Sequence, residues 1–338
     1  MLGGSLPGST IENYYFLTVA ILAIPTFLLI REMLEIAKII GTDQNRVLWY
    51  FVATPSFLFI ILLNWYAIGV YFAVFGIRKF LQGGYGWSGF LLGLSAASNL
   101  VTAAPALGMV LAIRNRDDAV GFVASAVLCF AAINAPFIAL NPSLWLSFWQ
   151  YHSDWYIEGS WMLAFLPSFS PLRHFVFPIL FVLLYGVIVW ISRRTAIGSV
   201  ITLSWLTTFA FLFSTYVFTP QMQLILLPFF AVVPIVKRYW EFLAFDIINS
   251  LFLVLAFSEI LLPFGITYSF DVSAYADPLR WLAILRSVWL GKMLLLDGLL
   301  PPMPAKVRSW AQSLRLVGDP VGRPSPRPVA PTAVHESE

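Results

Sequence analysis

SAASNLVTAAP, residues 95–105, places Ser, Asn, Thr and Pro in the middle of an apolar run that extends from 85 to 113. A helix rises about 1.5 Å per residue. One helix over this run would therefore exceed the hydrocarbon core of a bilayer, which is about 30 Å thick. We predict two short helices joined by a polar turn. Whether this run crosses a membrane once or twice decides the orientation of every later segment.

A second long apolar run, 47–80, has Asn64 at its centre, within LLNWYAIG (62–69). A single helix over this run would be roughly 50 Å long. We predict a second pair of short helices here. The backbone groups freed at such a turn must be buried in protein or hydrated, because lipid offers them no hydrogen-bond partner.

Composition identifies the class of protein. Of 338 residues, 59% are hydrophobic and 11% are charged, whereas soluble domains carry about 25% charged residues. The mean hydropathy is +0.82. The sequence therefore predicts an all-α, polytopic transmembrane helix bundle over 1–300. Besides the two interrupted runs, membrane spans are predicted at 13–30, 119–140, 174–192, 197–218, 220–236, 242–265 and 280–300.

Basic residues predict the orientation of these spans. If each interrupted run crosses twice, all the basic clusters fall on one face, as the positive-inside rule expects. We therefore predict about eleven membrane helices, with the N-terminus outside and the C-terminus in the cytoplasm. The amphipathic segment 31–46 is predicted to lie along the cytoplasmic interface. The clusters are Arg31, Lys38 and Arg46; Arg78 and Lys79; Arg114 and Arg116; Arg193 and Arg194; and Lys237 and Arg238.

Residues 301–338 are predicted to form a basic, Pro-rich, largely disordered cytoplasmic tail. Such a tail suits anionic lipid headgroups rather than nucleic acid. Cys129 is the one cysteine, which excludes a disulfide framework and a cysteine-based zinc site, and the three histidines are far apart. We expect no metal and no cofactor, and no motif identifies catalytic residues.

FWQYHSDWYIEGSW, residues 148–161, collects ionisable and aromatic side chains within the longest predicted outer loop, 141–173. Trp and Tyr gather at membrane interfaces, so one interpretation of this histidine segment is an interfacial loop. Aromatic faces also stack on sugar rings, and an acid or imidazole beside them binds hydroxyls or phosphate. The second interpretation is a binding site for a sugar or sugar phosphate. Its candidate residues are Trp149, His152, Asp154, Trp155 and Glu158.

A second candidate site is the segment STYVFTPQ, residues 214–221, which joins two predicted spans and is called the corner below. Pro220 suits the first turn of a helix, where its missing N–H costs nothing. Gln221 then places an amide at the outer mouth, although an ordinary turn between two helices explains the same pattern. Asp246 and Glu259 lie within the predicted span 242–265, and we expect Asp246 to be solvated near its cytoplasmic end. A proton or ion relay is the alternative for these two carboxylates.

Three motifs occur in the order found in polytopic GT-C glycosyltransferases. VFTPQMQLILLP (217–228) resembles the "SPQY…LLP" corner of that family, residues 134–161 are similar to its "N-x-P-F…N-P…H" segment, and LLNWYAIG is similar to its "NWD" turn. The similarity covers 13–265 and is greatest to the polyprenyl-phosphate-mannose-dependent mannosyltransferases. It implies a GT-C-like fold, a polyprenyl-phosphate-linked sugar donor, a lipid or glycan acceptor, and a pocket that includes His152, Gln221 and Asn64.

Departures from the family pattern concern its charged residues. Tyr66 stands where "NWD" has Asp, Trp155 where an Arg often follows the histidine, and Asn99 near the place of a common Lys. The family's catalytic Asp lies on a long outer loop after its first span and removes the proton of the acceptor hydroxyl. Glu12 is the one acid before the first predicted span of this chain. If the resemblance holds, the base comes from an upstream segment or a separate partner chain, or it is absent.

Three functions are compatible with these features. The first is a membrane glycosyltransferase that transfers a hexose, mannose in particular, on the non-cytoplasmic face. The second is a non-catalytic GT-C-like subunit, which the missing Asp favours. The third is a transporter or flippase for a lipid-linked substrate, which the interrupted helices favour.

Overall fold

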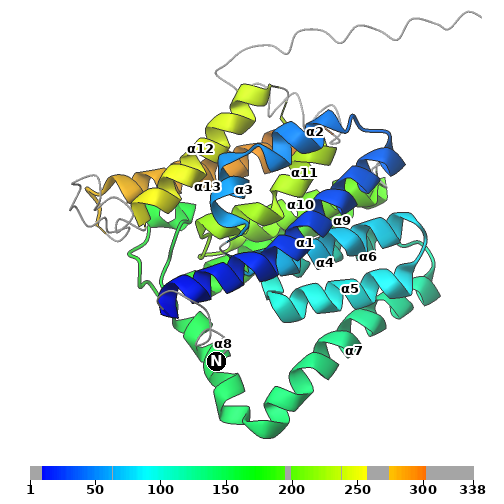
Figure 1. Cartoon of the computed structure of the whole chain (residues 1–338). Coiled ribbons are helices and arrows are strands. Elements are labelled where there is room, and N and C mark those ends of the chain that lie inside the picture. The colour runs from blue at the N-terminus through cyan, green and yellow to red at the C-terminus, as the bar shows by residue number, and fades with distance from the viewer. Residues whose placement is uncertain (1–9, 63, 195–198, 237, 257–273, 302–338) are drawn as a thin grey trace, which may run out of the picture. The chain divides into compact units, whose positions relative to one another are not determined.

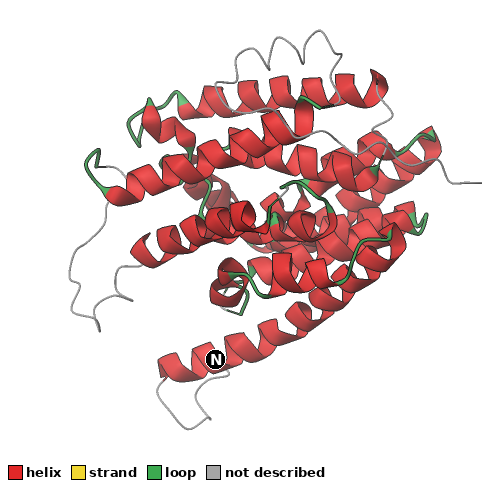
Figure 2. Ribbon diagram, turned by 90° about the horizontal axis from the view of Figure 1, so that it is seen from above, coloured by secondary structure: helices red, strands yellow, loops and turns green. Residues whose placement is uncertain are grey.

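The computed structural model describes residues 10–62, 64–194, 199–236, 238–256 and 274–301 (Figure 1). These ranges contain 13 α-helices with short 3₁₀ and π segments and no sheet (Figure 2). Four helices are long and apolar enough to cross a membrane: Glu12–Ile40, Arg116–Leu140, Arg173–Arg194 and Tyr239–Ala256. The all-α class is confirmed, and these helices indicate a multi-pass membrane protein. The predicted tail, apart from Pro301, and Glu259 lie outside the described residues.

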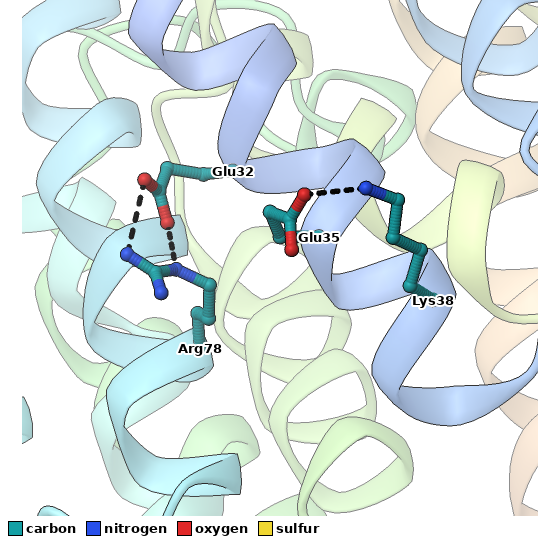
Figure 3. A network of polar contacts seen from close by, with 4 residues as sticks. All are labelled: Glu32, Glu35, Lys38 and Arg78. Atoms are coloured by element: carbon teal, nitrogen blue, oxygen red, sulfur yellow. Dashed lines mark hydrogen bonds and ion pairs between the residues drawn. The ribbon is translucent and has the colours of Figure 1, made fainter.

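The first helix, α1 (Thr10–Ile40), continues through Arg31 without a break. The predicted boundary between a span at 13–30 and a separate interfacial segment is therefore wrong. Ala37 is completely buried, and Glu32 is buried in an ion pair with Arg78 of α4 (Tyr66–Leu81), as Figure 3 shows. Because the charged group on the packed face has a partner, this face of the amphipathic segment can pack within the protein.

The first interrupted run breaks near Asn64, as predicted. Asn64 lies two residues before the start of α4, and its Oδ1 accepts from the backbone N–H of Tyr66 at 2.9 Å. The two halves of the run share contacts with η5 (Pro220–Ile225) but otherwise pack on different helices: α3 (Pro55–Ile60) on α12 (Tyr239–Ala256), and α4 on α1 and α5 (Tyr85–Ser98). They do not form a closed helix pair. The half before Asn64 consists of α2 (Asn45–Val47), η2 (Leu48–Val52) and α3 (Pro55–Ile60).

The second interrupted run breaks at Asn99, between α5 and the 3₁₀ turn η3 (Leu100–Ala103), which leads into α6 (Pro105–Ala112). Side chains replace the lost helical hydrogen bonds. Asn99 Oδ1 accepts from the N–H of Val101 at 3.1 Å, and Thr102 Oγ1 donates to the Asn99 carbonyl at 2.7 Å. These bonds satisfy freed backbone groups within the protein, as a turn at membrane depth requires.

Small residues bring α4 and α5 close together. Ser88 donates to the carbonyl of Gly76, and Ser95 donates to the carbonyl of Gly69, both at 2.8 Å. The later residue of α5, Ser95, contacts the earlier residue of α4, Gly69, so the two helices are antiparallel. Glycine and serine at such contacts are typical of helix packing in membranes, where close backbone approach replaces the hydrophobic effect.

Helix α5 also packs on α7 (Arg116–Leu140), in a parallel direction. A Cβ on Gly89 would meet the backbone of Phe122, and a Cβ on Gly93 would meet the backbone of Ala126. Since α5 and α7 are parallel, the chain between them must return to the end at which α5 began. The second run therefore reverses direction, as predicted. The basic residues that end α4 and begin α7 consequently lie at one end of the helix bundle.

The predicted outer loop 141–173 begins with a helix, α8 (Pro142–Asp154), so the prediction of a loop is wrong for this half. Asn141 caps α8, its Oδ1 accepting from the N–H of Leu144 at 3.0 Å, and Pro142 occupies the first turn. Figure 1 shows α8 leaving the end of α7 at a sharp angle. No residue of α8 is buried. The short 3₁₀ turn η4 (Trp161–Ala164) follows.

The core is built around α10 (Val200–Ser214), η5 (Pro220–Ile225) and α11 (Leu227–Val232). Phe209, Leu224 and Phe230 are all 0% exposed. The predicted spans 197–218 and 220–236 therefore form buried helices shorter than a full crossing, which takes about 20 residues. The remaining described elements are α9 (Arg173–Arg194), α13 (Pro278–Lys292) and η7 (Met293–Leu299).

Candidate functional site

The histidine segment and the corner lie side by side. The N–H of Glu158 donates to the carbonyl of Tyr216 at 2.9 Å, and the N–H of Phe218 donates to the carbonyl of Glu158 at 2.7 Å. These bonds form a single parallel β-bridge between Glu158 and Val217. The Tyr216 hydroxyl also donates to the carbonyl of His152, at 3.1 Å. Two segments that are distant in the sequence thus form one site.

Arg286 of α13 holds both segments from the interior. This residue is 0% exposed, and its guanidinium donates to the carbonyls of Gly159, at 3.2 Å, and of Phe218. Gly159 has φ +67°, and a Cβ there would meet both the Phe218 backbone and the guanidinium, so only glycine fits. The guanidinium also lies over the rings of Phe218 and Phe252, at 4.1 and 4.7 Å from their centroids. Aromatic faces favour a cation in this position.

The same guanidinium donates to Oδ1 of Asn249 in α12. The Asn249 amide donates in turn to Ser56 Oγ of α3, at 2.9 Å, and to the carbonyl of Pro220, at 3.1 Å. A polar network therefore joins α3, α12, α13 and the corner inside the bundle. The bond from Asn249 to Pro220 attaches the corner to these helices, which the other bonds join to one another.

Asp246 extends this network and is 0% exposed, so the prediction that it is solvated is wrong. Its carboxylate accepts from the N–H of Ser56 at 3.0 Å and from Gln223 Nε2 at 2.7 Å. Gln221, which the sequence pattern singled out, is only half-buried. The glutamine of the corner region that enters the network is Gln223, two residues later.

Glu158 is half-buried beside the network, outside the long apolar helices. The indole N–H of Trp155 donates to its Oε2 at 2.8 Å. Burial raises the pKa of Glu158 above its ordinary value, and the bond from Trp155 and the positive charge of Arg286 partly offset that rise. A carboxyl group with a raised pKa is suited to exchanging a proton nearer neutral pH.

His152 and Asp154 lie exposed in the last turn of α8. The Nδ1 atom of His152 is 2.7 Å from the carbonyl of Phe148. An Nδ1–H that donates to this carbonyl leaves the lone pair on Nε2. The His152 ring also lies near two aromatic rings, with centroids 4.2 Å from that of Phe148 and 6.1 Å from that of Trp155. Nε2 is therefore the nitrogen available to a ligand.

Two residues that the sequence interpretation did not select lie on the other side of the corner, at the start of α9. The guanidinium of Arg173 is 5.7 Å from the centroid of the Tyr216 ring, and the ring of His174 is 5.5 Å from it. Arg173 also donates to the carbonyls of Phe169 and Ser170, at 3.1 and 2.9 Å. A cation and a second imidazole thus flank the tyrosine that contacts the histidine segment.

Two predicted residues are placed elsewhere. Asn64 lies in the turn before α4, where it accepts from the N–H of Tyr66, and Trp149 lines a cavity between α5, α7 and α8. Trp149 stays linked to His152 through the ring of Phe148, whose centroid is 5.4 Å from that of Trp149 and 4.2 Å from that of His152. Within the residues that the structure describes, no group of three or more His, Cys, Asp or Glu side chains is arranged to hold a metal ion.

Comparison with known proteins gives no relative: the chain matches no known family, no curated protein and no solved structure. The resemblance to GT-C glycosyltransferases therefore depends on the quoted motifs alone and stays a prediction.

Proposed function

We propose that this chain is a membrane glycosyltransferase that binds a polyprenyl-phosphate-linked sugar, mannose in particular, at the site formed by the histidine segment and the corner. One observation carries the proposal. The segments that resemble two separate motifs of the same family are in direct contact, through Tyr216 with His152 and through Phe218 with Glu158. A shared ligand gives a reason for two such motifs to meet.

The side chains of the site suit the parts of such a donor. The exposed aromatic ring of Tyr151 and the half-buried ring of Trp155 offer faces on which a sugar stacks, and Glu158 offers a carboxyl group for its hydroxyls. His152 can bind the phosphate when Nε2 carries a proton, because a phosphate oxygen accepts hydrogen bonds. In the reaction, the acceptor hydroxyl oxygen bonds to the anomeric carbon. The bond from that carbon to the phosphate oxygen breaks, and polyprenyl phosphate leaves with the electron pair. The hydroxyl proton passes to a base that the resemblance assigns to another segment or chain.

The proposal includes a GT-C-like bundle of about eleven membrane helices, with the N-terminus outside and the C-terminus in the cytoplasm. Two structural relations support the position of the site. The basic ends of α4 and α7 share one end of the bundle, and α8 follows the opposite end of α7. The histidine segment is therefore at the end away from these basic clusters, which the positive-inside rule makes the non-cytoplasmic end.

Transfer of labelled mannose by native membranes that contain the full chain tests the proposal, because such membranes also hold any partner that supplies the base. The donor is polyprenyl-phosphate-mannose, and the acceptors are a membrane lipid extract and a glycan mixture. We expect transfer by the wild type, its loss in His152→Ala, and wild-type transfer in Ser143→Ala, at the far end of α8. Full transfer by His152→Ala would exclude that residue from the mechanism. Donor binding without turnover would indicate a non-catalytic subunit, and donor movement across proteoliposomes would indicate a transporter; either result contradicts the proposal.

A further inference from the structure

A cavity of about 450 Å³ lies between the C-terminal end of α5, the C-terminal half of α7 and α8. Pockets for small ligands typically enclose about 300–1,000 Å³. No charged side chain lines this cavity, and most of its wall is hydrocarbon. Apolar lining residues include Ala97, Leu100, Phe137, Leu140, Leu144 and Phe148.

The cavity lies where one end of a membrane span meets an aromatic helix. Helix α7 is long and apolar enough to cross a membrane, and the cavity is at its C-terminal end. Helix α8, which follows, contains the tryptophans and the tyrosine that are typical of a membrane interface. Phe137 and Leu140 are 62% and 85% exposed, so this wall is open to the surroundings of the protein. The surroundings of such a span are the hydrocarbon chains of the bilayer.

Trp149, which lines the cavity, carries a polar atom without a partner among the described residues. This atom is the indole Nε1, which is buried. The neighbouring Trp145 differs, because its Nε1 donates to Asn134 Oδ1 at 3.0 Å. A buried N–H without an acceptor is costly. Because Nε1 has almost no exposed surface, the indole ring must move toward the cavity before a ligand with an oxygen acceptor next to a hydrocarbon chain can remove that cost.

We propose that the cavity binds one hydrocarbon chain of a bilayer phospholipid, and that an ester carbonyl of the same lipid accepts from Trp149. The uncharged wall favours a chain over a phosphate group, and the open side at α7 gives lipids of the bilayer direct access. Phe148 and Trp149 of the histidine segment line this cavity, whereas Arg286 and the corner do not. The inference does not depend on the proposed glycosyltransferase function.

Native mass spectrometry of the purified full-length chain in detergent tests this site. We expect one retained phospholipid per chain in the wild type. Ala97→Phe fills the cavity and should remove most of it. Ala131→Phe adds the same bulk on an exposed part of α7 outside the cavity and should retain lipid as the wild type does. Trp149→Phe keeps an aromatic ring and should bind the lipid about two- to tenfold more weakly, the value of one neutral hydrogen bond.

Three results would overturn the proposal: no retained lipid in the wild type, equal retention in Ala97→Phe and Ala131→Phe, or a retained polyprenyl phosphate in place of the phospholipid. The last result would assign the cavity to a sugar-carrier lipid. If Ala97→Phe does not elute as a single folded species, the titration of phospholipid into Trp149→Phe decides, and wild-type affinity in that variant contradicts the proposed hydrogen bond.

Discussion

Replacing Arg286 by Lys tests how the two segments of the site are held together. The substitution keeps the positive charge, so the cost of burying a charge remains, whereas the planar fork of donors is lost. The guanidinium serves three acceptors: the carbonyls of Gly159 and Phe218, and Oδ1 of Asn249. A compact ammonium on a shorter stem cannot serve all three, and we expect it to lose two. At about 1.5–3 kcal/mol for each bond from a charged group, Arg286→Lys lowers the free energy of unfolding by about 3–6 kcal/mol.

Unfolding in detergent micelles, followed by circular dichroism during titration with a denaturing detergent, measures this loss. The matched control is Arg116→Lys, because Arg116 is exposed at the start of α7. Surface substitutions of this kind usually change stability by about 0.5 kcal/mol or less. Equal unfolding curves for Arg286→Lys and Arg116→Lys would refute the reasoning, since they would show that the buried guanidinium does not hold the two segments.

Three further predictions concern helix packing, ion pairing and pH. Gly89→Ala should lower the free energy of unfolding by about 1–3 kcal/mol, because its Cβ meets the backbone of α7, whereas Gly121→Ala adds its Cβ in open space and should not; equal effects would contradict the packing of α5 on α7. Glu32→Gln should cost about 1–3 kcal/mol in the same titration, because it leaves the part-buried guanidinium of α4 unpaired, and Glu35→Gln, in an exposed pair, should cause no measurable change; an unchanged Glu32→Gln would show that the buried pair does not contribute. The pKa of Glu158 is raised in the folded protein, so the stability that this carboxyl contributes is present below its ordinary pKa and is lost as pH rises through the raised value. Melting midpoints from acid to neutral pH should show this fall in the wild type and less of it in Glu158→Gln; identical profiles would refute it.

Breaks in the helices were the most predictable feature of the fold. Asn64 and Asn99 stand in runs too long for one crossing, and each asparagine side chain accepts from a backbone N–H two residues later, in the turn that separates two helices. The sequence predictions of helix boundaries were wrong where contacts between distant segments determine where a helix ends. The charged residues at 31 and 32 end the apolar run in the sequence, but α1 continues through them. It can do so because Glu32, on the packed face of α1, forms an ion pair with Arg78. The helix after Asn141 could have been predicted from the Asn-Pro pair, which is typical of a helix start.

Only the two segments of the candidate site, and not the buried network that joins them, could be predicted from the sequence. Both segments were marked by their residue types, yet their pairing depends on Arg286, which lies far from them in sequence. An arginine within the predicted span 280–300 was the available signal, because such a residue usually faces protein. The choice between Gln221 and Gln223 depends on the local helix type. In the 3₁₀ turn η5, side chains three residues apart align, so Gln223 lies above Pro220, whose carbonyl already belongs to the network.

Cross-linking of the histidine segment to the corner tests the central claim most directly. Cysteines replace Glu158 and Val217, which are paired across the β-bridge, in a Cys129→Ala background. Mild oxidation in native membranes should join this pair efficiently. The control pairs Val217→Cys with Ser143→Cys, which lies about 14 Å before His152 along α8 by helix rise, and should remain reduced. An uncross-linked Glu158–Val217 pair, or equal yields from both pairs, would show that the two segments do not share one site.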